Sequence, residues 1–307
     1  MSEQLKGFIH TITEKQLNVF SIRILQKGRL LAHWDRDKDH RRVQHSISKS
    51  FTCMAVGLAL EEGLIHLDAT LGDYFSYDHD HVPVAQRNLP SPQELRLRDL
   101  LRMTSGHDSP PLWADERASL TEKDWAKYYM SLPLDRVPGE QFTYSSGDTF
   151  MISAMLQAAT GQTVKDYLTP RLFVPLGIHD VEWETSPLGV TLGCAGLWIS
   201  NEELSRFGQL LLQEGHWEGT QLVPADWIRQ ATSQQIETTG EGDWGKGYGY
   251  QFWMCSHDAY RADGAYGQLC IIIPSKEAVI CINSEEENMQ GILNAVWNEV
   301  LPLYTQR

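Results

Sequence analysis

The sequence predicts an α/β fold of the α+β kind, in which one antiparallel sheet is built from both ends of the chain and flanked by helices. Three observations carry this prediction. Apolar and polar residues alternate near the start of the chain, helical spacing dominates the middle, and strand-like alternation returns after Trp244. We therefore expect an α/β lobe at about residues 1–72 and 190–307, with a mainly helical lobe at about 73–189 inserted into it.

The first strands and the first buried helix have clear limits in the sequence. Residues 18–34 alternate apolar and polar positions on both sides of Lys27-Gly28, a pattern typical of a β-hairpin. From Ser46 onward the apolar residues recur at helical spacing as far as Gly63, which stands where a C-terminal helix cap would be. This pattern predicts a buried helix of about four turns.

The rest of the chain divides into helical and strand-like segments. Five helical segments separated by Pro- and Gly-rich loops are predicted at 94–106, 122–132, 149–161, 163–178 and 201–215. Strand-like segments follow at 247–255, 260–274 and 277–284, and helical spacing returns at 287–304. Four aromatic residues at the first of these strands are predicted to pack in the core rather than to form a site: Trp244, Tyr248, Tyr250 and Trp253.

The composition excludes several classes of partner. Of the 307 residues, 42% are hydrophobic and 21% charged, which is typical of a globular protein that folds over its whole length. The 40 acidic residues outnumber the 26 basic ones, and a net charge of -14 repels nucleic acid and anionic lipid surfaces. Residues 1–20 lack the apolar core of a secretory signal, and no apolar span is long enough to cross a bilayer. We therefore expect a cytoplasmic protein with neither nucleic acid nor membrane as a partner.

Neither the cysteines nor the polar clusters point to a metal or cofactor. The cysteines are an odd number, are widely separated, and stand mostly among apolar residues, as reduced packing cysteines do: Cys53, Cys194, Cys255, Cys270 and Cys281. The Asp-His-Asp-His run at 78–81 lacks a second cluster of ligands at metal-binding spacing, so a solvated loop is expected there. No phosphate-binding Gly-rich loop or dinucleotide fingerprint is present. We therefore expect neither a cofactor nor a metal.

Ser46 and Lys49 form the first candidate for chemistry. They stand three residues apart at the start of the predicted helix, so their side chains project from one face about a turn apart. A serine hydroxyl becomes a nucleophile when a neighbouring base takes its proton, and a lysine whose pKa is lowered by burial can be that base. Taken alone, this short motif favours the alternative of a helix cap followed by a solvated lysine.

The wider context is more specific. Residues 46–51, Ser-Ile-Ser-Lys-Ser-Phe, resemble the first active-site motif of the class C β-lactamase superfamily of serine hydrolases and penicillin-binding proteins. Residues 141–147 resemble its second motif, Tyr-x-Asn, with Tyr144 at the tyrosine position. Further similar segments follow the family's order, at 98–107, 171–178, 203–215 and 262–268. This resemblance, over residues 18–285, implies the β-lactamase/transpeptidase-like fold and a serine hydrolase.

The resemblance also implies roles for individual residues. Ser46 would attack an ester or amide carbonyl and form an acyl-enzyme, while Lys49 and Tyr144 handle protons at its hydroxyl and at the leaving group. Which of these two is the general base stays open. The alternative for Tyr144 is an ordinary packed tyrosine with a satisfied hydroxyl.

The third motif of the family aligns with Ala262, Asp263 and Gly264. Gly264 would let the substrate backbone approach, and the backbone N–H of Ala265 would join that of Ser46 in an oxyanion hole. Ser146, in the second motif, would contact the substrate together with Asp263 and Gly264. A simple turn is the alternative for the Asp-Gly pair.

Two departures from the family's pattern narrow the expected activity. Ala262 replaces the family's cationic residue, which binds substrate carboxylates, and Ser146 replaces an asparagine. Arg261 is adjacent, but its side chain should point to the opposite face of the strand from Ala262. The pattern is closer to the family's esterases and 6-aminohexanoate-oligomer hydrolases, which predicts a small-molecule ester or amide substrate. The alternatives are a β-lactamase or D-alanyl-D-alanine carboxypeptidase, and a non-catalytic binding protein on the same fold; the oligomeric state stays open.

Overall fold

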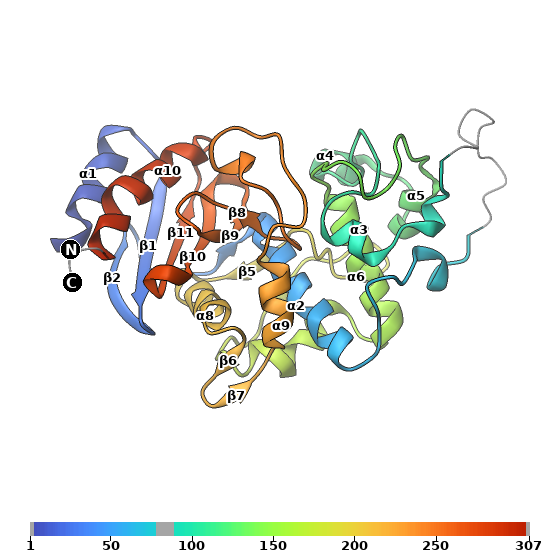
Figure 1. Cartoon of the computed structure of the whole chain (residues 1–307), viewed down its shortest axis with the longest axis horizontal. Coiled ribbons are helices and arrows are strands. Elements are labelled where there is room, and N and C mark those ends of the chain that lie inside the picture. The colour runs from blue at the N-terminus through green and yellow to red at the C-terminus, as the bar shows by residue number, and fades with distance from the viewer. Residues whose placement is uncertain (1–2, 78–88, 305–307) are drawn as a thin grey trace.

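A six-stranded antiparallel sheet made from both ends of the chain organises the protein (Figure 1). The computed structural model describes residues 3–77 and 89–304. The strand order is β2-β1-β11-β10-β9-β8. In chain order these strands are β1 Val19–Gln26, β2 Arg29–Asp35, β8 Trp253–Met254, β9 Tyr260–Gly264, β10 Gln268–Ile273 and β11 Ala278–Ser284. The predicted fold class is confirmed, because an N-terminal hairpin pairs directly with the last strand of the chain.

The described helices and the smaller strands complete the element list. The helices are α1 Lys6–Glu14, α2 Ser48–Glu61, α3 Leu97–Leu101, α4 Ala114–Ser119, α5 Trp125–Ser131, α6 Ser146–Thr160, α7 Val164–Leu168, α8 Asn201–Leu212, α9 Ala225–Ala231 and α10 Met289–Ala295. A three-stranded sheet contains β3 Arg42–Val43, β5 Leu197–Ile199 and β4 Glu182–Trp183 in that order, and a small hairpin joins β6 His216–Trp217 to β7 Thr220–Gln221.

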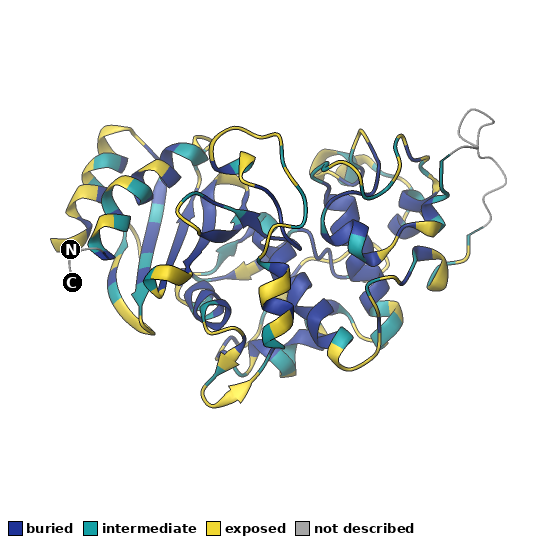
Figure 2. Ribbon diagram, viewed as in Figure 1, coloured by how far each residue is buried: buried dark blue, intermediate teal, exposed yellow. Residues whose placement is uncertain are grey.

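The two faces of the large sheet are covered by different helices. Side chains of α1 and α10, such as Phe8 and Ile292, pack with Ile22 and Ile280 on one face. On the other face, residues of α2 and α8 join one large core that also contains Ala262. Figure 2 shows the buried residues of this second core continuing from the sheet through α2 into α6. Because alternate residues of a strand point to opposite faces and every residue of β10 and β11 is buried, these two strands are covered on both sides.

Three of the differences between the predicted and the observed elements concern the large sheet and its helices. Helix α1 was not predicted, although Phe8 and Ile12 are spaced one turn apart and both are buried. The predicted strand at 247–255 is reduced to β8, because Gln251 adopts a positive φ of 64° and its side-chain amide donates to the carbonyl of Leu101 at 2.8 Å. The predicted helix from Ser46 begins with a 3₁₀ turn at His45–Ile47, and α2 proper starts at Ser48.

Of the other expectations from the sequence, some are confirmed and others stay predictions. All five cysteines are free and buried, which confirms that they are packing residues. Within residues 3–77 and 89–304, no helix is long and apolar enough to cross a membrane. The run at 78–81 lies outside the described residues. The lobe boundaries near residues 72 and 190 stay a prediction.

Candidate active site

Ser46 lies in the 3₁₀ turn that leads into α2, and this turn is fastened to β5. The backbone N–H of Gln44 donates to the carbonyl of Leu197 at 2.8 Å, and its side-chain amide donates to the carbonyl of Ile199 at 3.0 Å. Ser48 Oγ donates to the carbonyl of His45 at 2.6 Å and accepts from the N–H of Leu197 at 3.2 Å. These contacts fix the backbone on both sides of Ser46, whose own side chain is half-buried.

Lys49 is a buried amine one turn beyond Ser46. Its side chain is 1% exposed, and Nζ donates to the carbonyl oxygen of Cys194 at 3.0 Å. Burial lowers the pKa of Lys49 to about 8; the nearby charge of Arg117 acts in the same direction and that of Asp148 opposes it. A lysine with such a pKa is neutral in about a tenth of molecules at pH 7, so it can accept a proton.

The carbonyl that receives Lys49 belongs to a loop at 191–196 held between two helices. Thr52 on α2 donates to the carbonyl of Gly193 at 3.0 Å, and Ser153 on α6 donates to the carbonyl of Thr191 at 2.6 Å. Gly193 has a positive φ of 66°, and a Cβ there would lie 2.9 Å from Ser153 Cβ. The sequence analysis missed this loop, because a backbone carbonyl can come from any residue type.

Tyr144 is brought against Ser46 from the segment just before α6. Its hydroxyl is close enough to the Ser46 side chain for that serine to lower its pKa, and its ring centroid lies 5.1 Å from Lys49 Nζ. Burial raises the pKa of Tyr144 well above its usual range, while the contact with Ser46 partly opposes that shift. Tyr144 is therefore a neutral hydroxyl at physiological pH, able to donate or relay a proton.

Aromatic residues predicted only as core form the support of Tyr144. Trp253 stacks on the Tyr144 ring at 5.5 Å, and Tyr248 meets it edge-on at 6.2 Å. Tyr250 instead stacks on Trp227 at 5.6 Å within the main core, as predicted. The packing of Trp253 and Tyr248 on Tyr144 fixes the ring that reaches Ser46.

The residues that flank Ser46 and Ala265 contact one another in pairs. A Cβ on Gly264, the last residue of β9, would lie 2.3 Å from the carbonyl oxygen of Gln44. On the other side, the rings of His45 and Tyr266 meet edge-on at 5.4 Å. Ser46 and Ala265 are thus neighbours, as an oxyanion hole built from their backbone N–H groups requires.

The other residues of the second and third motifs lie around this pair. Ala262 is fully buried in the core on the α2 side of β9. Arg261 and Asp263 share the opposite face and form an ion pair of 2.7 Å, which agrees with the predicted direction of Arg261. The charge of Asp263 also raises the pKa of Tyr144, so this carboxylate acts on the site electrostatically. Ser146 is the buried first residue of α6, two positions from Tyr144.

Comparison with known proteins agrees with this geometry. The family model described as Beta-lactamase matches residues 15–294. The chain belongs to the β-lactamase family. Within it, the chain is 27% identical over 145 residues to a D-aminopeptidase from Brucella anthropi, a match that covers 47% of this chain and 26% of the relative. The match thus spans about a quarter of that relative's length.

Solved structures of the same fold cover nearly the whole chain. A protein from Bacillus anthracis provisionally named a 6-aminohexanoate-dimer hydrolase superposes with a TM-score of 0.77 at 20% identity, over 95% of this chain and 80% of that one. An octameric penicillin-binding protein homologue from Pyrococcus abyssi gives 0.76 at 16% identity, over 98% and 77%. At such low identity these likenesses show the β-lactamase-family fold alone.

Gly264 offers a test of the oxyanion hole in this β-lactamase-family site. In Gly264→Val, the new side chain meets the backbone carbonyl of Gln44, so the end of β9 must move away from Ser46. We expect kcat/KM for an ester to fall at least 100-fold, since a displaced oxyanion donor has effects of that size. Gly161→Ala is the control: its φ of 69° makes it similarly strained but it meets no atom within 4 Å. Equal activity of the two variants would contradict the assignment.

Asp148 is a buried acid beside the site that the sequence analysis did not single out. Its Oδ1 accepts hydrogen bonds from Ser105 and Tyr129, each at 2.9 Å, and its backbone N–H donates to Ser145 Oγ. Within the described residues its Oδ2 has no hydrogen-bond partner. Burial raises the pKa of Asp148 to about 6, against the opposing effect of these hydrogen bonds.

The raised pKa of Asp148 predicts how the free energy of unfolding depends on pH. A carboxyl whose pKa is higher in the folded state favours folding at low pH, and that contribution is lost as pH rises from about 4 to 6. Asp148→Asn removes the dependence, so its free energy of unfolding should rise relative to wild type by up to about 3 kcal/mol between pH 4 and 7.5. Urea unfolding at each pH measures this, and any constant cost of the new amide cancels.

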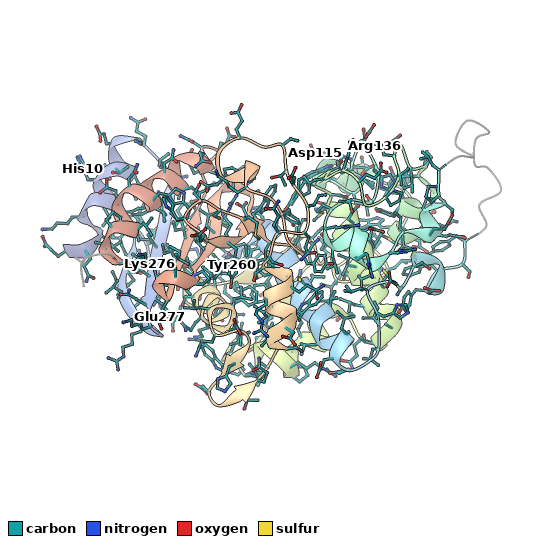
Figure 3. All side chains as sticks on the ribbon, viewed as in Figure 1. His10, Asp115, Arg136, Tyr260, Lys276 and Glu277 are labelled. Atoms are coloured by element: carbon teal, nitrogen blue, oxygen red, sulfur yellow. The ribbon has the colours of Figure 1, made fainter. Side chains whose placement is uncertain are left out.

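The control for this prediction is Asp115→Asn. Asp115 is an exposed residue of α4 and is labelled in Figure 3. Its substitution by Asn removes the same charge from the surface. If the two variants show the same pH dependence relative to wild type, the buried environment of Asp148 is not the cause.

Proposed function

We propose that this protein is a serine hydrolase that forms an acyl-enzyme on Ser46 with a small ester or amide substrate. The observation that carries the proposal is the proximity of the Tyr144 hydroxyl to the Ser46 side chain, which lowers the pKa of that tyrosine, next to a buried Lys49 whose pKa is about 8. A nucleophile, a proton relay and a proton acceptor are thereby within reach of one another, as acyl transfer requires.

In the proposed acylation step, Ser46 Oγ attacks the carbonyl carbon and loses its proton to Lys49, directly or through the Tyr144 hydroxyl. The negative charge that develops on the carbonyl oxygen is stabilised by the N–H groups of Ser46 and Ala265. When the tetrahedral intermediate collapses, the bond to the leaving group breaks and Tyr144 passes the proton to the departing oxygen or nitrogen. Water then attacks the acyl-enzyme by the reverse proton route and releases the acid.

Lys49 is favoured over Tyr144 as the general base in this scheme. At pH 7 a proton acceptor of pKa about 8 is partly available, whereas a tyrosine whose pKa is raised stays protonated. Tyr144 is then the relay, because its hydroxyl lies near Ser46 while Lys49 Nζ donates to the Cys194 carbonyl.

The substrate class follows from what the third motif lacks. Ala262 is buried and carries no charge, and Arg261 is occupied by Asp263, so neither offers the cation that would fix the carboxylate of a penicillin or a cell-wall peptide. This supports an ester or amide hydrolase over a β-lactamase or carboxypeptidase. The D-aminopeptidase and 6-aminohexanoate-dimer hydrolase names of similar proteins are compatible with an amide substrate.

Covalent trapping tests the proposal. The protein is incubated separately with p-nitrophenyl acetate, a chromogenic cephalosporin and a fluorophosphonate, with release of chromophore followed and intact mass and peptide mapping used to locate any adduct. We expect turnover of the ester and one adduct on Ser46. Fast cephalosporin hydrolysis would favour a β-lactamase instead, and no adduct with any of the three would favour the non-catalytic binding protein.

A further inference from the structure

A cavity of about 470 Å³ lies next to the residues that flank Ser46 and Ala265, and Tyr144 does not line it. His45, which precedes Ser46, and Tyr266, which follows Ala265, both line it. Both residues have a positive φ, 46° for His45 and 63° for Tyr266. Residues other than glycine rarely adopt a positive φ, and those that do are often found at functional sites. The volume is within the range of small-molecule pockets, while neither Lys49 nor Tyr144 lines it.

The position of the cavity relative to Tyr144 assigns it to one part of the substrate. The leaving group must receive a proton, so it departs on the side of the Tyr144 hydroxyl. The acyl group is the other substituent of the same carbonyl carbon and therefore points away from Tyr144. The edge-on pair of His45 and Tyr266 forms the wall at which an acyl chain on Ser46 would enter the cavity.

The walls of the cavity combine aromatic surface with two arginines, Arg41 and Arg42. Phe20, Trp198 and Tyr266 supply rings, of which Trp198 is 37% and Tyr266 46% exposed. The Arg42 guanidinium carbon lies 3.9 Å from the centre of the Phe20 ring. A guanidinium stacked by its face on a ring keeps its N–H edge available for a carboxylate.

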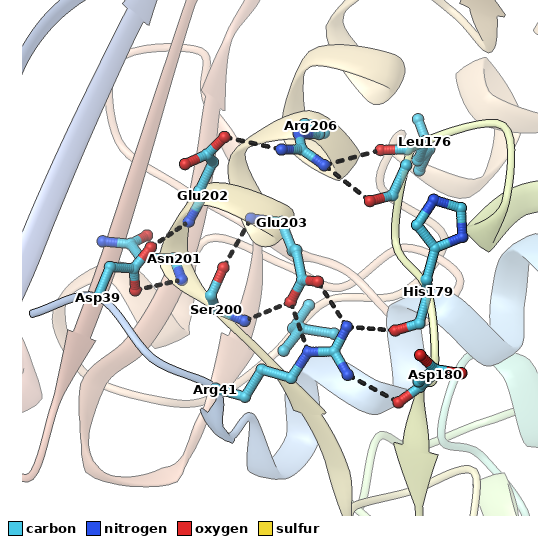
Figure 4. Close-up of polar contacts among 12 residues, drawn as sticks. Asp39, Arg41, Leu176, His179, Asp180, Ser200, Asn201, Glu202, Glu203 and Arg206 are labelled. Atoms are coloured by element: carbon cyan, nitrogen blue, oxygen red, sulfur yellow. Dashed lines mark hydrogen bonds and ion pairs between the residues drawn. The ribbon is translucent and has the colours of Figure 1, made fainter.

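Arg42 differs from its neighbour Arg41, which is fully engaged. Figure 4 shows Arg41 bonded to the carboxylate of Glu203, at 3.0 and 2.7 Å, and to the carbonyls of His179 and Asp180. Within the described ranges, by contrast, Arg42 has no carboxylate within 4 Å. The bonds of Arg41 hold the chain just before β3, and Arg42 lines the same cavity as Arg41.

We propose that this cavity is an acyl-group pocket selective for acyl chains that end in a carboxylate, with Arg42 as the residue that binds that carboxylate. Arg42 and Ser46 are four positions apart on the chain, a span of at most about 14 Å, so a dicarboxylic acyl chain of four to six carbons can bridge much of it. The pocket also contains the exposed Glu285, whose negative charge opposes binding of such a chain. This inference rests on the proposed acyl-enzyme at Ser46.

Two esters that differ only at the chain end test the proposal. Mono-p-nitrophenyl adipate and p-nitrophenyl hexanoate have six-carbon acyl groups ending in a carboxylate and a methyl group. In wild type we expect the ratio of kcat/KM values to favour adipate. In Arg42→Met the ratio should fall at least 10-fold, and in Glu285→Gln it should rise 2- to 5-fold. A ratio in Arg42→Met within 2-fold of wild type would overturn the proposal.

Arg36→Gln is the matched control for loss of charge. The Arg36 guanidinium also lies over the Phe20 ring, at 4.5 Å, but it does not line the cavity. We expect its ratio to change less than 2-fold; a fall as large as that in Arg42→Met would show that general surface charge, and not the pocket, selects the anionic ester.

Binding separates this proposal from the proposed hydrolase function. Calorimetric titration of adipate into Ser46→Ala, with and without Arg42→Met, measures the affinity of the pocket for adipate without any catalysis. Adipate binding that depends on Arg42, in a protein that turns over neither ester, would reject the hydrolase and keep the pocket. Ester turnover with no such binding and no dependence on Arg42 would reject the pocket and keep the hydrolase.

Discussion

Ser46→Ala is expected to lower kcat/KM for p-nitrophenyl acetate by at least 1,000-fold and to abolish labelling by a fluorophosphonate. The methyl group cannot attack a carbonyl, so acyl transfer has no nucleophile and only the weak catalysis of the remaining site is left. Losses of about 10³- to 10⁶-fold are typical when the nucleophile of a serine hydrolase is removed. Initial rates at several substrate concentrations, corrected for spontaneous hydrolysis, measure the effect.

The control for this variant is Ser48→Ala in the same turn. Ser48 Oγ bonds the carbonyl of His45 and the N–H of Leu197, so its loss should reduce the free energy of unfolding by about 1 to 3 kcal/mol. It leaves a nucleophile in place, so labelling of Ser46 should persist. If Ser46→Ala keeps more than a tenth of wild-type activity, or if Ser48→Ala alone abolishes labelling, Ser46 is not the nucleophile.

The parts of the site that the sequence could predict are local. Ser46 and Lys49 are one turn apart on the chain, and Tyr144 belongs to a short motif whose identity does not depend on distant residues. The hairpin at β1 and β2 was equally accessible, since a Lys-Gly turn between two alternating segments specifies it. Each of these patterns is local, but the assignment of Ser46, Lys49 and Tyr144 to an active site also needed the ordered set of similar segments over residues 18–285.

The parts that the sequence could not predict come from packing between distant segments. The carbonyl of Cys194 holds Lys49 because Thr52 and Ser153 clamp its loop, a constraint that leaves no signature in the identity of Cys194. Trp253 supports Tyr144 only because the sheet edge meets the segment before α6. Asp148 had a weak signal, an acid three residues after the N-cap Ser145, but that pattern also occurs at ordinary helix starts.

Lys49→Met should lower kcat/KM by about 10³-fold or more at pH 8, because Lys49 is a buried amine one turn from Ser46 and its pKa of about 8 leaves it partly unprotonated at that pH. Lys49→Arg separates the two ways in which Lys49 could act. An arginine keeps the positive charge but does not lose its proton in proteins. If Lys49 is the general base, both variants lose activity to a similar extent. Activity within 10-fold of wild type in a folded Lys49→Arg protein would show that only the charge matters.

The pH profile of the wild type gives the same assignment an independent check. If the neutral amine of Lys49 is the active form, kcat/KM rises with pH through a midpoint near 8. Arg117 lowers the pKa of Lys49, so Arg117→Gln stabilises the protonated amine and moves the midpoint to higher pH. Asp148 raises that pKa, so Asp148→Asn moves the midpoint to lower pH. Shifts in these opposite directions identify Lys49 as the titrating group, whereas a midpoint that neither substitution moves assigns the titration to another residue.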